Sequence, residues 1–511
     1  MRITNKIMQS NTLYNINQNK ELQDKLNTQI TTRKKVTKPS DDPIVAIRAL
    51  RLRSNLNQVS QYYEKNIPDA SQWIQLTETA IDTTVGVISN MIDECVRGSK
   101  GSLTSSDRGI ILESLRQLKS EVYATGDSDY AGRTIFTGYR TDMKLSFQKN
   151  ETVEYSIKEQ LTNKDISTFT FVDDGNIGTV NETTYKDAGI VSEQEIAMFP
   201  VNRFRLSYDN LDKDTVPVIE QVISYDADEN PITSTVCTPV VMSKDADPNP
   251  YRIVGDEDYA DYDPDAAIFV PETGELLLGK NIYDSIMKLT PETEIQISYS
   301  KNEWKSGDLR PEHYFACESD GVKYNESYLT KNGRNNKQVI AYDVGFNQTI
   351  EVNTTADEIY LHGIGRAVDE IISMLDEISK VDTTVKKLES MQGNSVYDQD
   401  QVELRLDAAK KAQTFLNDTI QKKFESSITE FQGYLDKANA ALTASGNRGL
   451  RLELVENRLG TQKTSFQELT SENEDADLAE LAVELKSAEL TYSAALASTG
   501  KLLQTSLLDY L

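Results

Sequence analysis

Residues 74–95 read IQLTETAIDTTVGVISNMIDEC, and this stretch decides the fold class of the protein. Its apolar residues recur every seven positions, at Ile74, Ile81, Ile88 and Cys95. A heptad repeat of this kind is typical of a long helix that packs lengthwise against other helices. The stretch therefore predicts a long amphipathic helix.

The same pattern continues on both sides of this stretch. Upstream, a heptad stripe runs through Val45, Ala49, Leu52, Leu56, Val59 and Tyr63. Asp41 and Asp42 can cap this helix, and Pro43 suits its first position. Downstream, Thr104–Asp107 is a helix-capping cluster, and it is followed by an apolar stripe at Ile111, Leu115, Leu118 and Val122.

Helical stripes return from about residue 356 and continue almost to residue 511. They run through Ile364, Val368, Ile371, Leu375 and Ile378, then Phe424, Ile428, Phe431, Leu435, Ala438 and Leu442, then Leu452, Val455, Leu459, Phe466 and Leu469. Ser445-Gly-Asn-Arg-Gly449 predicts an interruption between two of these helices.

The segment between the helical ends has a different character. It is rich in Tyr, Thr, Val and Asp, and short alternating runs occur at 168–172, 216–222 and 294–299. Such runs predict strands separated by turns. Because inserted domains usually leave and re-enter a chain at neighbouring points, the two helical ends are expected to pack antiparallel.

The predicted fold class is therefore α+β. The N- and C-terminal arms form a long antiparallel coiled coil or bundle, and a β-rich domain is inserted between them. The expected domains are residues 1–42 with 471–511 as terminal helices, 43–140 with 356–470 as a helical bundle, and 141–355 as the insert.

Composition excludes several classes of function. The 511 residues carry a net charge of −27, which argues against a nucleic-acid partner and against an anionic membrane surface. No run of about 18 apolar residues occurs, so membrane insertion is not expected. The polar first ten residues lack a secretory h-region, so export without a cleaved signal peptide is the expectation.

Little in the chain points to catalysis or to a cofactor. The cysteines, Cys95, Cys237 and Cys317, are far apart, and the only histidines are His313 and His362. His362 is expected in a partly exposed turn, and Gly363-Ile-Gly365 beside it lacks the third glycine of a dinucleotide-binding loop. We expect no enzyme activity and no cofactor.

One acidic pattern is a weak candidate for a metal site. Asp261, Asp263, Asp265 and Glu272 match positions 1, 3, 5 and 12 of a calcium-binding loop. The turn glycine of such a loop is replaced by Ala266, and carboxylates are abundant nearby. The alternative interpretation is a solvated acidic surface.

Short motifs at both ends resemble the bacterial flagellin family. At the N-terminus these are Met1-Arg-Ile-Thr-Asn-Lys6, Lys38-Pro-Ser-Asp-Asp-Pro43, Leu50-Arg-Leu-Arg53, Trp73-Ile-Gln-Leu-Thr-Glu78 and Gly132-Arg-Thr-Ile-Phe-Thr-Gly138. At the C-terminus they are Arg458-Leu-Gly460, Glu472-Asn-Glu-Asp-Ala-Asp477, Tyr492-Ser-Ala-Ala-Leu496 and Gln504-Thr-Ser-Leu-Leu-Asp-Tyr-Leu511. The first and last of these motifs look like the hook–filament junction branch of the family.

The resemblance implies a structural protein of the flagellum that forms the junction between hook and filament and seeds flagellin polymerisation. It implies export through the flagellar type III apparatus to an extracellular position. The implied partners are further copies in a ring, hook-associated protein 1, flagellin and an export chaperone. The alternative within the family is a filament subunit decorated with a β domain.

The apolar residues of the two terminal segments are the candidate assembly interface. They are Ile3, Ile7, Leu13, Ile16, Leu22, Leu26 and Ile30 at one end, and Leu485, Tyr492, Leu496, Leu503, Leu507 and Leu508 at the other. Isolated helices of this kind are marginal in water. We therefore expect them to be weakly ordered in the monomer and to fold when subunits pack together.

Overall fold

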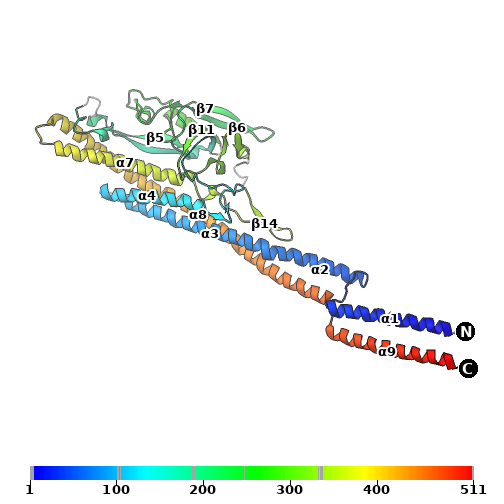
Figure 1. Ribbon diagram of the computed structural model, residues 1–511. Helices are drawn as coiled ribbons and strands as arrows, with labels where there is room; N and C mark the ends of the chain where they lie inside the picture. Colours follow the sequence, from blue (N-terminus) through cyan, green and yellow to red (C-terminus); the bar gives the residue numbers. More distant parts are fainter. Residues whose placement is uncertain are drawn as a thin grey trace. The chain divides into compact units, whose positions relative to one another are not determined.

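The structure is a computed structural model of the chain. The structure describes residues 5–100, 103, 105–186, 192–246, 248–291, 293–331, 333 and 338–508 (Figure 1). The helices are α1 (Asn5–Thr32), α2 (Pro43–Gln61), α3 (Ile67–Gly98), α4 (Ser105–Gly126), α5 (Pro250–Gly255), α6 (Lys280–Met287), α7 (His362–Met391), α8 (Gln399–Glu474) and α9 (Leu478–Leu508). A π-helical turn, Tyr62–Asn66, joins α2 to α3.

The strands lie almost entirely between α4 and α7, as the alternating runs predict. They are β1 (Asp129–Tyr130), β2 (Arg133–Thr134), β3 (Glu151–Leu161), β4 (Ile166–Asp173), β5 (Ala197–Arg205), β6 (Val218–Tyr225), β7 (Pro231–Cys237), β8 (Val240–Val241), β9 (Ala267–Val270), β10 (Glu275–Leu278), β11 (Ile295–Trp304), β12 (Ala316–Ser319), β13 (Val322–Tyr324), β14 (Ala341–Gly345) and β15 (Gln348–Glu351). The fold class is therefore α+β, with long helices at both ends and a β-rich middle.

The chain divides into two compact units. One consists of residues 1–71, 342–350 and 450–511, and the other of residues 72–341 and 351–449. The first, the terminal unit, contains α1, α2, α9 and the C-terminal part of α8. The second, the central unit, contains both large sheets, α4, α7 and most of α3. The three-part division expected from the sequence stays a prediction.

Two mostly antiparallel sheets form the β-rich part of the central unit. Their strand orders are β4-β5-β10-β9-β8 and β13-β12-β3-β11-β6-β7, and only the β8–β9 pair is parallel. In the first sheet Leu276 lies opposite both Phe204 and Phe269. These three side chains are fully buried in a core that also contains Tyr155, Ile297 and Trp304 of the second sheet. The alternation of the strands thus places one apolar face of each sheet in a shared core.

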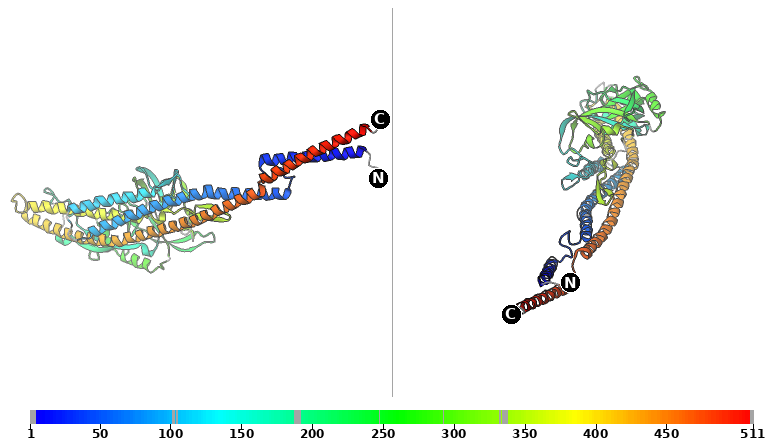
Figure 2. Two further views of the ribbon diagram at one scale, coloured as in Figure 1. Left: turned by 90° about the horizontal axis from the view of Figure 1, so that it is seen from below. Right: turned by 90° about the vertical axis from the view of Figure 1, so that its right-hand side faces the viewer.

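The helices of the central unit form an elongated bundle. In the left view of Figure 2, the axes of α3, α4, α7 and the first part of α8 are roughly aligned. The stripe that opens the sequence lies inside this bundle, since Ile74, Ile81, Ile88 and Cys95 are all 2% exposed or less. Leu115, Ile371 and Phe424 contribute buried side chains from the other three helices. The heptad prediction is confirmed.

The expected helix break at Ser445–Gly449 is wrong, because α8 is continuous through it. A Cβ atom on Gly449 would lie 3.4 Å from Glu78 Oε1 and 3.6 Å from Ile74 Cγ2. Ser445 is completely buried on the same helix. The small residues therefore allow close packing of α8 against α3, where the sequence pattern suggested a turn.

The close packing of α8 against α3 can be tested by replacing each of two glycines of α8 by leucine. We expect Gly449→Leu to lower the free energy of unfolding by about 1–3 kcal/mol, because the added atoms must displace Ile74 or Glu78. Gly433 has nothing within 4 Å of its Cβ position. Gly433→Leu should therefore raise stability by about 0.5–1 kcal/mol through helix propensity alone. Equal effects in urea unfolding would contradict close packing at Gly449.

Candidate assembly interface

The two terminal helices, α1 and α9, lie antiparallel in the terminal unit. Both ends of the chain in Figure 1 therefore lie on the same side of this pair. The tight turn before α9 is held by backbone hydrogen bonds, in which Lys35 N donates to Glu474 O and Ala476 N donates to Arg33 O. Asp477 caps α9, because its Oδ1 accepts from Ala479 N at 2.8 Å.

Ion pairs between charged side chains also stabilise this turn. Lys34 Nζ lies 2.7 Å from Asp475 Oδ1 and 3.2 Å from Glu474 Oε2, and Arg53 pairs with the same oxygen of Glu474. Burial would raise the pKa of Glu474, but Arg53 and Lys34 outweigh it and the pKa is lowered. The turn thus sets where α9 begins relative to α1.

One face of the helix pair is closed by apolar contact. Leu26 of α1 packs with Leu481 and Ala488 of α9, and Ile30 and Leu485 lie against them. Three of the predicted interface residues, Leu26, Ile30 and Leu485, are therefore brought together within the chain. The antiparallel arm contact that the sequence predicts is formed by these side chains.

Other apolar residues of the two helices remain exposed. Among the predicted residues, Ile7, Leu13, Leu22 and Leu496 are each between 46% and 58% exposed. The prediction missed Tyr14, Val483 and Leu490, which are 64–71% exposed. Val483 and Leu490 are seven residues apart, so the heptad spacing could have identified them. Apolar side chains that a helix pair leaves exposed are candidates for contact with another protein.

The remaining predicted residues are distributed as follows. Ile16 is buried and Tyr492 is half-buried. Ile3 lies outside the described residues. The structure describes Leu503, Leu507 and Leu508 as part of the helix α9, but it does not describe their side chains. The role of all these residues in assembly stays a prediction.

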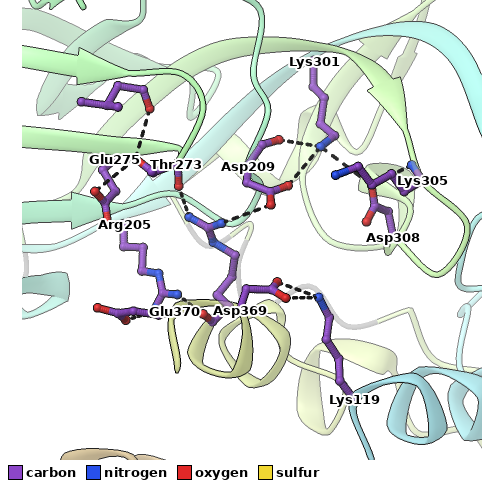
Figure 3. Close-up of polar contacts among 12 residues, drawn as sticks. Lys119, Arg205, Asp209, Thr273, Glu275, Lys301, Lys305, Asp308, Asp369 and Glu370 are labelled. Carbon is purple, nitrogen blue, oxygen red and sulfur yellow. Dashed lines mark hydrogen bonds and ion pairs between the residues drawn. The ribbon is translucent and has the colours of Figure 1, made fainter. Parts of the chain in front are cut away.

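A network of charged side chains joins the β-rich part of the central unit to its helices, and Figure 3 labels Arg205, Glu370, Lys119 and Asp369 of this network. Glu370 of α7 is its centre. Its Oε1 lies 2.6 Å from Arg203 Nη2, and its Oε2 lies 2.9 Å from Arg205 Nη1 and 2.8 Å from Lys423 Nζ. The two arginines come from β5 and the lysine comes from α8. Side chains from β5 and α8 therefore converge on one carboxylate of α7.

The electrostatics of this carboxylate follow from its neighbours. Burial alone would raise the pKa of Glu370, but the charges of Arg203, Arg205 and Lys423 hold it well below the ordinary value. Arg203 also pairs with Glu275 and places its guanidinium 3.9 Å from the ring centre of Phe169. A second pair, Lys119 with Asp369 at 2.6 Å, links α4 to α7. The network thus links the sheet to the helices through ionised side chains.

Three of the four candidate calcium ligands have other partners in the structure. Asp263 Oδ1 accepts from Asp265 N, Asp265 Oδ1 accepts from Asn281 Nδ2, and Glu272 pairs with Lys213 at 3.1 Å. Among the described residues, no group of three or more His, Cys, Asp or Glu side chains is arranged to hold a metal ion. Within the same residues, no helix is long and apolar enough to cross a membrane.

Both histidines of the chain lie in the central unit and are held neutral. His362 starts α7, and its Nε2 lies 2.9 Å from the hydroxyl of Tyr208, which itself donates to Leu309 O. His362 must therefore donate from Nε2. Burial lowers the pKa of His362 to about 3 and that of His313 to about 4.

These pKa values predict a loss of stability in mild acid. Both folded pKa values lie below the ordinary 6.5, so the unfolded chain binds protons first as the pH falls. The contribution of the two neutral histidines to the free energy of unfolding should be fully present above pH 6.5. Below pH 6.5 it should fall by at most about 1.4 kcal/mol per pH unit for each histidine. A His313→Gln, His362→Gln double variant should show a shallower slope in urea unfolding between pH 6.5 and 5. An unchanged slope would contradict the burial of neutral imidazoles.

Part of the chain is similar in sequence to known proteins. Residues 3–141 match the family model of the bacterial flagellin N-terminal helical region. The chain is 32% identical over 143 residues to flagellar hook-associated protein 3 of Salmonella typhimurium, covering 28% of this chain and 45% of that protein. It is 30% identical over 165 residues to the protein of the same name from Escherichia coli, covering 32% and 52%. The chain thus spans about half the length of these relatives.

Solved structures give a weaker likeness. The flagellar junction protein FlgL from Legionella pneumophila is 10% identical, with 83% of this chain and 100% of that chain covered and a TM-score of 0.29. FlgL from Xanthomonas campestris is also 10% identical, with 81% and 99% covered and a TM-score of 0.24. At TM-scores this low, the structural likeness carries no weight here, and the sequence matches stand alone.

The sequence matches indicate the class of protein that the chain is similar to. Residues 3–141, which contain α1 to α4, match the N-terminal helical region of the bacterial flagellins. The particular protein to which it is similar is flagellar hook-associated protein 3.

Proposed function

We propose that this chain is a structural protein of the bacterial flagellum that forms the junction between hook and filament and seeds flagellin polymerisation. The observation that carries the proposal is the set of exposed apolar residues on α1 and α9. Leucines such as Leu13 and Leu490 are exposed by more than half on helices that the chain pairs along only one face. Helices of this kind gain most of their stability from partners.

In this proposal the partners are further copies of the chain in a ring, hook-associated protein 1 and flagellin, with an export chaperone before secretion. The similarity to flagellar hook-associated protein 3 supports this choice of partners. The site of action is the extracellular flagellum. The function is assembly, with no enzyme reaction, and the residues at the interface are those that the two terminal helices expose.

Deletion of the gene tests the proposal in the bacterium that encodes it. We expect intact bare hooks by electron microscopy, together with unpolymerised flagellin in the culture supernatant. Loss of the bulk filament material without leakage of another flagellin would instead make the chain a filament subunit. Normal filaments and normal swimming would overturn both functions.

A further inference from the structure

The central unit buries a lysine in contact with two carboxyl groups. Lys301 lies on β11 and is 1% exposed, and Figure 3 shows its side chain reaching toward Asp209 with Asp308 nearby. Its Nζ lies 3.5 Å from Asp209 Oδ1 and 3.8 Å from Asp308 Oδ2, and it donates to Asp209 O at 2.5 Å. Asp209 follows β5, 92 positions away, whereas Asp308 lies in the turn after β11. One buried amine thus meets acids from two separate segments.

Backbone hydrogen bonds hold both acids in place beside this lysine. Near Asp209, Asp212 N donates to Ser300 O at 2.9 Å, which ties that segment to β11. In the turn after β11, Lys305 N donates to Asp308 Oδ2 at 3.0 Å. Holding an amine and an acid side by side in this way raises their effective concentration and favours a reaction between them.

The surroundings of the amine disfavour its charged form. The buried ring of Trp304 has its centre 5.3 Å from Lys301 Nζ and excludes water from that side. Burial lowers the pKa of Lys301 and raises the pKa of Asp308. Burial would also raise the pKa of Asp209, but the charges of Arg366 and Lys301 outweigh it and the pKa is lowered. A desolvated lysine is a nucleophile, because its neutral amine is more accessible.

From this arrangement we infer that Lys301 and Asp209 condense to an isopeptide bond, which cross-links β11 to the segment after β5. The lysine nitrogen forms a bond with Cγ of Asp209, and the bond from this carbon to one carboxyl oxygen breaks. That oxygen takes two protons from the ammonium group and leaves as one water molecule. One positive and one negative charge disappear together. Asp308, 3.8 Å from the nitrogen, carries the protons between the two groups.

The chemistry of the site favours the amide over an ion pair. An ammonium group that is removed from water is costly even when it is paired, whereas an amide is neutral. The side chain of Asp209 is 35% exposed, so the water that forms can leave. Arg366 Nη1 lies 3.9 Å from Asp209 Oδ2 and would stabilise the negative charge that develops there when the nitrogen adds. This inference concerns the central unit and does not depend on the proposed role in the flagellum.

Mass spectrometry of the full chain tests the inference. The folded chain is kept at neutral pH, then denatured and digested with trypsin. We expect peptide 206–213 joined to peptide 289–305, with no cleavage after Lys301 and a mass one water molecule below the sum of the two peptides. Fragmentation should place the link between Lys301 and Asp209. Unlinked peptides at full mass would mean an ion pair only and would overturn the inference, as would a link to Asp308.

Matched lysine variants assign the link to this site. Lys301→Arg keeps the charge but replaces the amine, so the linked peptide should be lost completely. Lys158 lies in the same sheet, 3.7 Å from Glu220, and its side chain is 33% exposed. Lys158→Arg should leave the yield of the linked peptide unchanged. Equal loss from both variants would contradict a site at Lys301.

Variants of the two acids keep the test decisive if the buried arginine prevents folding. Asp209→Ala should abolish the linked peptide in a chain that circular dichroism shows to be folded. Asp308→Asn should slow its formation by about 100-fold or more, because an amide cannot carry the protons. A linked peptide that persists in Asp209→Ala would overturn the cross-link, and an unchanged rate in Asp308→Asn would overturn the proton transfer.

Discussion

A Glu370→Ala chain is expected to lose about 3–5 kcal/mol of its free energy of unfolding, the cost typical of breaking a buried ion pair by removing one partner. Arg203 is 4% exposed, and the side chains of Arg205 and Lys423 are 17% and 15% exposed, so water would replace the lost carboxylate only in part. The sheet and the two helices would then face each other through unbalanced positive charge.

Urea unfolding with a matched control measures this effect. Asp376 lies on the same helix and pairs with Arg116 at 3.7 Å, but its side chain is 54% exposed. Asp376→Ala should change stability by no more than about 0.5 kcal/mol. Similar losses from the two variants would show that Glu370 is not the centre of the network.

The second large effect is expected in assembly. A Leu13→Asp, Leu490→Asp double variant should fail to restore filaments when it replaces the natural chain. Burial of each leucine against a neighbour would contribute about 1.5–3 kcal/mol, and a carboxylate at the same place would lose this and would be desolvated. The helical content of the monomer should stay the same by circular dichroism, because both leucines are exposed there.

The control for this experiment places one carboxylate on α1, close to position 13. Asn17 of α1 is exposed, and Asn17→Asp removes no apolar surface. This chain should assemble normally. Filaments from the double variant, observed by electron microscopy, would exclude the exposed apolar residues of α1 and α9 as the assembly interface.

Much of the helical architecture could be predicted from sequence, because it rests on local periodicity. The stripe from Ile74 to Cys95 is buried as expected, and Asp42 caps α2 with its Oδ1 3.0 Å from Ile44 N. The alternating run at 168–172 lies in β4. In each case the pattern lies within the element itself, so no distant contact is needed to interpret it.

The glycines of α8 show where local interpretation fails. Glycine near the end of an apolar stripe usually marks a helix end, and the pattern at 445–449 fits that rule. The neighbour that explains these residues, α3, is more than 300 residues away in the chain. The same limit applies to Glu370, whose partners in β5 and α8 have no sequence signal of their own.

The sequence by itself determined the α+β class, the helical ends, the β-rich middle and the resemblance of its terminal motifs to flagellins. Tertiary structure alone decided which apolar residues of α1 and α9 face each other and which stay open, since a heptad stripe is wider than one contact. It also brought Arg203, Arg205, Glu370 and Lys423 together, because side chains from separate elements meet only when strands and helices pack. Periodicity is local, whereas charge pairing and cavities depend on the packing of distant segments.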